Sequence, residues 1–254
     1  MVALKTATAV CLSALAVVSG VVVGSSDAQL VGATRVLAVV GVPTLRFAVP
    51  RYDTSGTYPQ VKGAGLNLMA VNGALRNAVI ADQHSYAATY ARKEKARDVQ
   101  KDHGVYRMGI DPRYLAASTV VVSALLPLTR ELFPGQHSGD GWLGITVRVP
   151  SGTRVTITDL FTHPREGLRA LATAYKDKLR KTPDGVECLK LYPDDYRPTV
   201  ANYSAFALTP RGLVVGTWED TACYRIATTL PYSFLKPYLS NLGSTLVAGA
   251  RRPV

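Results

Sequence analysis

The residues best suited to chemistry lie close together in the stretch "FPGQHSGDGW" at positions 133–142. His137, Ser138 and Asp140 are the residue types of a serine hydrolase: a base, a nucleophile and a carboxylate that orients the base. Adjacent residues of one loop rarely reach this geometry, because triad members converge from separate elements, and the chain lacks a G-x-S-x-G motif. We therefore interpret them as ordinary loop residues and keep an esterase or other cell-wall hydrolase as the alternative hypothesis.

Other carboxylates and histidines are scattered along the chain. Asp159, Asp194 and Asp195 could supply paired carboxylates for glycoside chemistry. Asp159 ends a strand-like segment, which favours a turn or capping role, and the neighbouring Asp194 and Asp195 stand in a loop where their side chains point apart into solvent. The four histidines show no H-x-x-x-H spacing, so the sequence predicts no metal site and no cofactor.

Aromatic residues form a third group of candidates. Tyr192, Tyr196, Tyr203 and Trp218 surround a predicted hairpin, and Trp142 follows a glycine-rich loop. Such rings suit glycan stacking or protein contacts, but they also make ordinary core packing, which we favour for the group. Trp142 is the ring that we expect to be most exposed. The weak ligand-binding candidates are Trp142, Tyr192, Tyr196 and Trp218.

The N-terminus indicates export. Lys5 precedes an apolar or small stretch at 6–24, and Ser26-Asp27-Ala28 has the small-x-small pattern that a signal peptidase accepts. An uncleaved anchor is the alternative, because nineteen such residues nearly span a bilayer. We expect a secreted or cell-envelope protein that contacts the membrane only through this segment, where it is retained.

Charge and cysteine content agree with that compartment. The chain of 254 residues has a formal net charge of +11, and removing residues 1–28 would take away one Lys and one Asp and leave that charge unchanged. A basic exported protein attracts anionic envelope polymers, acidic glycans or acidic proteins, although the charge also serves solubility alone. Nucleic acid is not expected, because stacking motifs and zinc spacings are missing.

Two cysteines would remain after cleavage, since Cys11 leaves with the signal. Cys188 and Cys223 form an even pair in an oxidising setting, which predicts a disulfide between them. The bond would close a loop of about 36 residues, worth roughly 3–4 kcal/mol in the chain-entropy model. Their spacing is not C-x-x-C, so a redox pair is not indicated.

The elements that must position these residues alternate between strands and helices. Apolar residues at three- and four-residue spacing predict a long helix from Leu66 to about Gly104, and a shorter helix begins near Pro164 and stops at 183–185. Hairpins are expected at 143–161 and 204–218. The other predicted pieces are strands at 44–53 and 104–114, a turn and a short extended piece at 55–63, a buried central strand at 115–128, a strand with a short helix at 223–239, and a frayed end at 240–254.

These elements predict an α+β fold, in which antiparallel β-hairpin sheets pack with one long and one shorter α-helix. The expected organisation is a signal peptide at 1–28, a leader or tether at 29–43, an N-terminal segment at 44–114, a C-terminal domain at 115–240 and a tail at 241–254.

The order "GTRVTITDLF", helix, "FALTPRGLVV" and "TTLPYSFLKPYL" resembles the RsiV-type secreted domain of unknown function. That domain forms the outer part of a lysozyme-sensing anti-sigma factor and accompanies bacterial peptidoglycan deacetylases. The upstream "YPQVKGAGLNLMAVNGALRNAVIADQ" is similar to the segment that precedes it in such proteins. Secreted mycobacterial antigens of the immunogenic-protein type carry a similar unit, which points to an actinobacterial source. The resemblance covers about 45–240.

The resemblance implies a non-catalytic binding module of the bacterial cell envelope, with an envelope glycan or a lysozyme-like protein as its ligand. We expect neither a full anti-sigma factor nor a deacetylase, because a sigma-factor-binding segment and a deacetylase domain are missing. Besides the esterase, a structural secreted antigen without a tight ligand is the second alternative.

Overall fold

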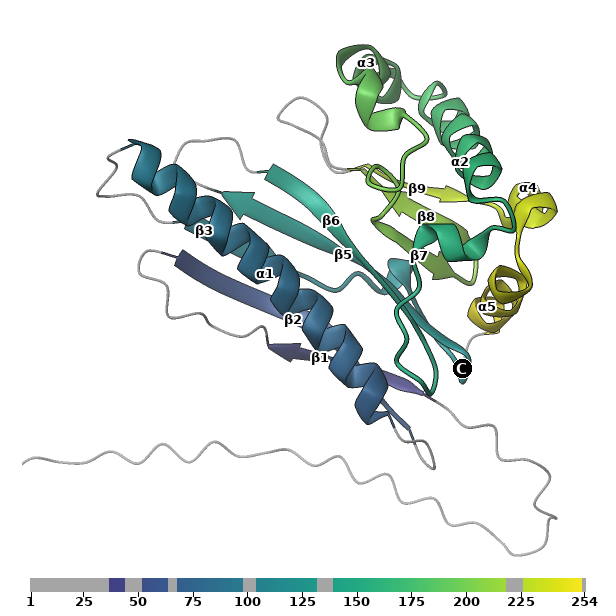
Figure 1. Cartoon of the computed structure of the whole chain (residues 1–254), viewed down its shortest axis with the longest axis horizontal. Coiled ribbons are helices and arrows are strands. Elements are labelled where there is room, and N and C mark those ends of the chain that lie inside the picture. The colour runs from purple at the N-terminus through teal and green to yellow at the C-terminus, as the bar shows by residue number, and fades with distance from the viewer. Residues whose placement is uncertain are drawn as a thin grey trace, which may run out of the picture. The chain divides into compact units, whose positions relative to one another are not determined.

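Two β-sheets and five α-helices make up the part of the chain that the computed structural model describes (Figure 1). The described residues are 37–43, 52–63, 68–97, 104–131, 139–217 and 226–252, and they belong to one compact unit. The predicted α+β class is confirmed. Within these ranges, no helix combines the length and the apolar character needed to cross a bilayer.

The larger sheet has six strands in the order β1-β2-β3-β5-β4, with β6 on β5 as well. The pair β2–β3 is parallel and the other pairs are antiparallel. Because β3 pairs with β5, the sheet runs through both the predicted N-terminal segment and the predicted C-terminal domain. The strands are β1 (Ala38–Pro43), β2 (Tyr52–Lys62), β3 (Gly104–Met108), β4 (Leu115–Ala117), β5 (Val121–Glu131) and β6 (Gly139–Arg148).

The single central strand predicted at 115–128 is divided into two antiparallel strands, β4 and β5. Strand β5 is buried, as predicted, and it is covered on both faces. Leu126 and Leu128 belong to the core beneath helix α1, whereas Leu125 belongs to a small cluster that faces the second sheet. Successive side chains of a strand point to opposite faces. Both sets of β5 residues are therefore buried, which explains why its sequence is continuously apolar instead of alternating.

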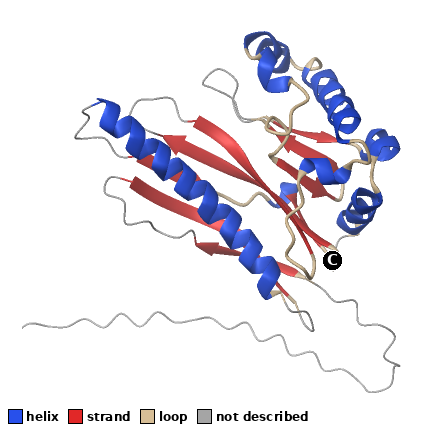
Figure 2. Ribbon diagram, in the orientation of Figure 1, coloured by secondary structure: helices blue, strands red, loops and turns tan. Residues whose placement is uncertain are grey.

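Helix α1 (Met69–Arg97) lies across the six-stranded sheet (Figure 2) and confirms the predicted long helix. Val71, Leu75 and Val79 form part of its buried face. Near its start, the Asn72 side chain accepts a hydrogen bond from the Val61 N–H at 2.8 Å and donates one to the Val61 carbonyl at 3.0 Å. This amide therefore ties the first turns of α1 to strand β2.

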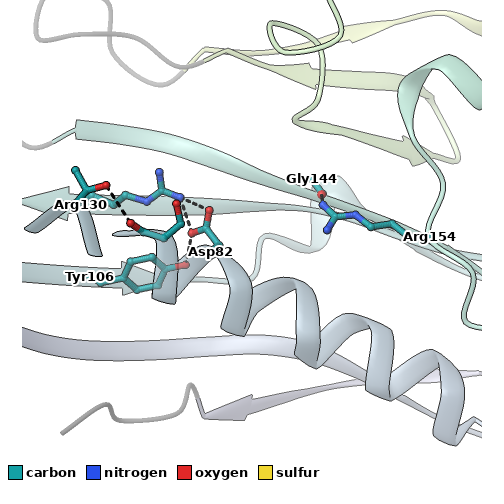
Figure 3. Close-up of polar contacts among 7 residues, drawn as sticks. Asp82, Tyr106, Arg130, Gly144 and Arg154 are labelled. Carbon is teal, nitrogen blue, oxygen red and sulfur yellow. Dashed lines mark hydrogen bonds and ion pairs between the residues drawn. The ribbon is translucent and has the colours of Figure 1, made fainter. Parts of the chain in front are cut away.

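A polar cluster, here called the Asp82 clasp, ties the later part of α1 to β3 and β5 (Figure 3). Asp82 forms an ion pair with Arg130, and it accepts a hydrogen bond from the Tyr106 hydroxyl at 2.7 Å. The Arg130 guanidinium also lies over the rings of Tyr86 and Tyr106, at 5.9 and 5.8 Å from their centroids. The Tyr86 hydroxyl donates to the Glu131 carbonyl.

The smaller sheet has the antiparallel order β7-β8-β9 and comprises β7 (Phe206–Thr209), β8 (Gly212–Gly216) and β9 (Ala227–Leu230). The predicted hairpin at 204–218 is confirmed, and its turn consists of Pro210 and Arg211 between β7 and β8. The strand predicted before Pro231 is confirmed as β9. The two sheets are joined by the Ser123 hydroxyl, which lies 2.6 Å from the Thr146 hydroxyl and accepts the Leu208 N–H at 2.8 Å.

Four helices accompany the smaller sheet (Figure 2). Its main core contains Leu171 and Tyr175 from α2, Leu208 and Leu213 from the hairpin, and Leu246 from α5. The helices are α2 (Pro164–Leu179), α3 (Pro183–Leu191), α4 (Tyr232–Leu235), which continues as the 3-10 turn η4 (Lys236–Tyr238), and α5 (Asn241–Arg251).

The predicted hairpin at 143–161 is confirmed only next to its turn. Strand β6 pairs with β5 along one edge, and on the other edge the expected return strand is reduced to one bridge between Val147 and Arg154. After it the chain forms a 3-10 turn, Ile157–Leu160, in which the Asp159 carboxylate accepts the Thr156 N–H at 2.7 Å. This local capping bond gives the backbone an alternative to the sheet ladder, and it buries Ile157 in the main core.

Two boundaries in the C-terminal half also differ from the prediction. The segment at 183–185 begins α3, because Pro183 suits a first helical position and Thr182 accepts the Gly185 N–H at 3.2 Å. The end of the chain is not frayed, since Ser240 caps α5 and α5 buries Leu246 in the core. A close approach to the Leu160 carbonyl requires glycine at Gly243, whose added Cβ would lie 2.2 Å from that oxygen.

The N-terminal predictions need smaller corrections. Part of the expected leader, Ala38–Pro43, is strand β1 and pairs with β2, and the expected turn at 55–63 belongs almost entirely to β2. Gly56 allows the long β2 because it takes φ of 115° where the backbone passes Met108. Most of the predicted strand at 44–53 lies outside the described residues.

Candidate functional site

The residues proposed for catalysis lie mostly beyond what the structure describes. His137 and Ser138 fall outside the described ranges, and Asp140 is described only as a backbone position in β6, opposite Thr129. The loop expected at 133–142 is shorter than predicted, because its last residues begin β6. The hydrolase hypothesis therefore stays a hypothesis.

The expectation that Trp142 is exposed is wrong, because its side chain is only 7% exposed. It packs edge-on against Tyr114, with ring centroids 5.4 Å apart, and an added Cβ on Gly216 would meet its ring at 2.4 Å. Position 142 lies in a strand and faces the second sheet, so its ring cannot form a surface platform for a ligand. Its indole N–H is buried without a hydrogen-bond partner among the described residues.

The other aromatic candidates are mainly core residues. Tyr196 and Tyr203 are fully buried against Tyr175, with both centroid distances at 6.0 Å. Burial, with the neighbouring Tyr175, raises the pKa of Tyr203 well above its usual value. A buried ring is closed to a ligand from solvent, so the proposal for Tyr196 needs correction. Tyr192 is half-buried, and Trp218 lies outside the described residues.

Cys188 is buried in the main core, and its predicted partner Cys223 lies outside the described residues. The disulfide therefore stays a prediction. Among the described side chains, no group of three or more His, Cys, Asp or Glu residues is placed to hold a metal ion.

The structure reveals a site that the sequence did not single out. A groove of about 560 Å³ opens between the β7–β8 turn, the α4–η4 segment and α5, and we call it the basic groove. Arg211, Lys236 and Arg251 line it, and all three are exposed. Its other lining residues are Pro210, Pro231, Tyr232, Ser233, Leu239, Ser244, Val247 and Ala248.

The tight turn between β7 and β8 positions Arg211. The Thr209 hydroxyl donates to the Gly212 carbonyl at 2.9 Å and accepts the Gly212 N–H at 3.3 Å, which holds the two strand ends together. Gly212 lies against the backbone of Leu230, where an added Cβ would be 2.3 Å from the carbonyl oxygen. The turn therefore presents the arginine from a rigid base.

Tyr232 joins the α4 side of the groove to the same turn. Its hydroxyl donates to the Thr209 carbonyl at 2.8 Å and accepts the Thr209 N–H at 3.0 Å. Burial raises the pKa of Tyr232, and the Thr209 backbone bond and the Arg251 charge offset only part of that rise. Tyr232 is therefore a neutral scaffold, while Lys236 begins η4 and Arg251 stands in the last turn of α5, where a cation complements the helix dipole.

The lining of the basic groove is suited to binding an anion. Its described lining residues include three cations and no Asp or Glu. Guanidinium and ammonium groups bind carboxylates or phosphates through charge-assisted hydrogen bonds. Val247, Leu239 and Ala248 add an apolar floor, which suits an organic anion better than a small hydrated ion.

Of three comparisons with known proteins, only the one with solved structures finds a similar fold. No family model matches the chain, and no curated protein matches it. A solved structure of a DUF3298 family member from Bacteroides fragilis aligns with a TM-score of 0.50 and 15% identity over 85% of this chain and 97% of that chain. The fold resembles that of DUF3298 proteins. A second DUF3298 family protein, from Pseudomonas aeruginosa, aligns with a TM-score of 0.49 and 13% identity, over 82% of this chain and 94% of that chain.

The basic groove could not be found by reading the sequence. Its cations come from a hairpin turn, a 3-10 turn and a C-terminal helix, and they are separated by 25 and 15 positions in the chain. The general signal was the net charge of +11, which predicts an anionic partner but does not place it.

Proposed function

We propose that this chain is a secreted, non-catalytic binding module of the bacterial cell envelope, and that its basic groove holds the anionic group of an envelope glycan. The observation that carries the proposal is the grouping of Arg211, Lys236 and Arg251 around an apolar floor without a carboxylate in the lining. The signal-like N-terminus and the motifs that resemble the RsiV-type domain support the compartment and the class of protein.

Electrostatics supports an anion as the ligand. A unit charge about 4 Å from each cation gains roughly 1–4 kcal/mol per pair near a protein surface, before desolvation is subtracted. No acidic lining residue cancels this attraction. The net charge of +11 further raises the local concentration of anionic polymers around the protein.

The size of the groove favours a glycan unit over a protein partner. Its volume of about 560 Å³ lies inside the range of roughly 300–1,000 Å³ that is typical of small-ligand sites. A stable protein interface buries about 800 Å² on each partner, mostly over broad surfaces. We therefore place the glycan ahead of a lysozyme-like protein.

Calorimetric titration with two anionic polymers and one neutral polymer tests the proposal. The probes are oligogalacturonate, oligo(glycerol phosphate) and dextran of matched length. Both anions should bind and dextran should not, and Arg211→Ala or Lys236→Ala should weaken anion binding by about tenfold, or about 1.4 kcal/mol. Preference for one anion would distinguish a carboxylate from a phosphate ligand.

Matched controls separate the groove from general basicity. Arg107→Ala on β3 and Lys190→Ala on α3 remove the same charges from exposed positions that do not line the basic groove. If the control variants weaken anion binding equally, binding depends on the overall charge and not on a specific site, which would overturn the proposal. Hydrolysis of nitrophenyl esters that is lost in Ser138→Ala and His137→Ala would instead support the esterase.

A further inference from the structure

A second groove lies on the opposite side of the α4–η4 segment. It has a volume of about 650 Å³ and opens between α2 and that segment, and we call it the α2 groove. Figure 1 shows α4 between α2 and α5. Phe234 and Tyr238 line the α2 groove, whereas Tyr232, Lys236 and Leu239 line the basic groove. One helical segment therefore forms a wall of both grooves.

The α2 groove has a different chemical character. Its floor combines two small residues of α2, Ala170 and Ala174, with the half-buried rings of Phe234 and Tyr238. Aromatic rings beside such a floor offer a flat apolar surface of the kind that the faces of sugar rings match.

The rim of the α2 groove is polar and nearly balanced in charge. It carries Glu166, Arg169, Thr173 and Asp177, so it presents acceptors and donors together, with a formal sum of −1. Asp177 is also paired with Arg180 at 2.7 Å, which offsets part of its charge. Hydroxyl groups both donate and accept hydrogen bonds, so this rim fits a neutral polyol. A phosphate or carboxylate would instead meet two carboxylates.

We propose that the two grooves are two subsites for one linear, anionic oligosaccharide, with a neutral sugar ring in the α2 groove and the acidic residue in the basic groove. This inference rests on the proposed function and deepens it. A helix with its side chains is about 10–12 Å across, so the ligand is an oligosaccharide that crosses the α4–η4 segment and not a monosaccharide.

Joining two subsites in one ligand has a measurable consequence. The second contact becomes intramolecular once the first has formed, so its effective concentration is high and the affinity of the longer ligand rises. Hyaluronan oligosaccharides alternate a neutral N-acetylglucosamine with a glucuronate, and they provide a probe with both units. An octasaccharide should therefore bind at least tenfold more tightly than free glucuronate.

The test compares titrations of the chain and its variants with glucuronate and with the hyaluronan octasaccharide. Tyr238→Ala should weaken octasaccharide binding by about fivefold to tenfold, the loss expected for one ring contact, and should leave glucuronate binding unchanged. Arg211→Ala should weaken both ligands. Tyr114→Ala is the matched control, since Tyr114 is also half-buried but lines neither groove.

The outcomes separate the two proposals. If Arg211→Ala weakens both ligands while Tyr238→Ala behaves like Tyr114→Ala, the α2 subsite is wrong and the basic groove stands. If Arg211→Ala weakens neither ligand, the proposed function itself fails. Arg169→Ala, an exposed change on α2, gives a second reading of the α2 groove should Tyr238→Ala reduce the thermal stability of the fold.

Discussion

Replacing Asp82 by alanine should strongly destabilise the protein, because it removes the centre of the Asp82 clasp. The carboxylate pairs with Arg130 and accepts the Tyr106 hydroxyl at 2.7 Å. The side chains of Arg130 and Asp82 are only 16% and 18% exposed. The change therefore removes a close carboxylate from a largely buried guanidinium, and it loosens the contact of α1 with β3 and β5.

The exposed fractions set the magnitude. Removing one partner of a buried ion pair costs about 3–5 kcal/mol, and the partial exposure of this pair places the expected loss near the lower end, at about 3 kcal/mol. For a chain of this size, 1 kcal/mol shifts the melting temperature by about 2–4 °C. We therefore expect a decrease of about 6–12 °C.

An exposed ion pair in the same chain provides the control. Arg197 and Asp194 lie 2.6 Å apart with side chains 66% and 70% exposed, and such pairs contribute about 0–1 kcal/mol. Asp194→Ala should therefore shift the melting temperature by less than about 4 °C. Thermal unfolding followed by circular dichroism measures both variants under the same conditions.

A second substitution makes the reasoning refutable. If the loss of the Asp82 carboxylate beside a buried charge is the cost, adding Arg130→Met to Asp82→Ala should recover part of the lost stability, because the buried charge is then gone. Equal stability of the Asp82→Ala and Asp194→Ala variants would refute the argument. So would a double variant that loses the full sum of the two single changes.

Three further predictions concern other parts of the fold. Gly56→Ala should cost at least about 3 kcal/mol in urea unfolding, since φ is 115° and the added Cβ would lie 1.8 Å from a backbone oxygen of β3. The control is Gly73→Ala in α1, where the added Cβ meets no atom within 4 Å. This control should stabilise the protein by about 0.5–1 kcal/mol. Burial raises the pKa of Tyr203 and Tyr232, so at high pH the folded state binds more protons than the unfolded state. The free energy of unfolding should therefore fall as the pH rises above 10.0, the ordinary pKa of tyrosine. Absorbance titration at high pH should show two phenols that ionise only on unfolding. Leu246→Ala should cost about 2–5 kcal/mol in thermal unfolding, and a neutral result would mean that α5 does not belong to the core.

Much of the fold could be predicted because the signals are local. The spacing of Val71, Leu75 and Val79 predicts one face of a long helix, and that face is buried in α1. The turn at 210–211 between two apolar runs predicts the β7–β8 hairpin. In each case the pattern depends on residues that are close together in the sequence.

Other predictions failed where a distant partner decided the outcome. The apolar alternation at 145–157 is compatible with a hairpin, but beyond the bridge between Val147 and Arg154 the chain turns into a 3-10 helix that buries Ile157 in the core. The small residues of α5 predict a frayed end. In the structure, position 243 requires glycine because the Leu160 backbone lies against it. Burial of Trp142 likewise depends on the second sheet, which no local pattern reveals.

The sequence by itself determined the α+β class, the main helices and strands, and the strongly basic balance, because propensity, periodicity and net charge are properties of neighbouring residues or of the whole composition. Only the tertiary structure decided which cations act together. Arg211, Lys236 and Arg251 form one groove because the β7–β8 turn, η4 and α5 meet around Tyr232. Electrostatic attraction between a cation and an anionic ligand falls with the distance between them. The distances between side chains of separate elements are set by how those elements pack, which the sequence pattern does not show.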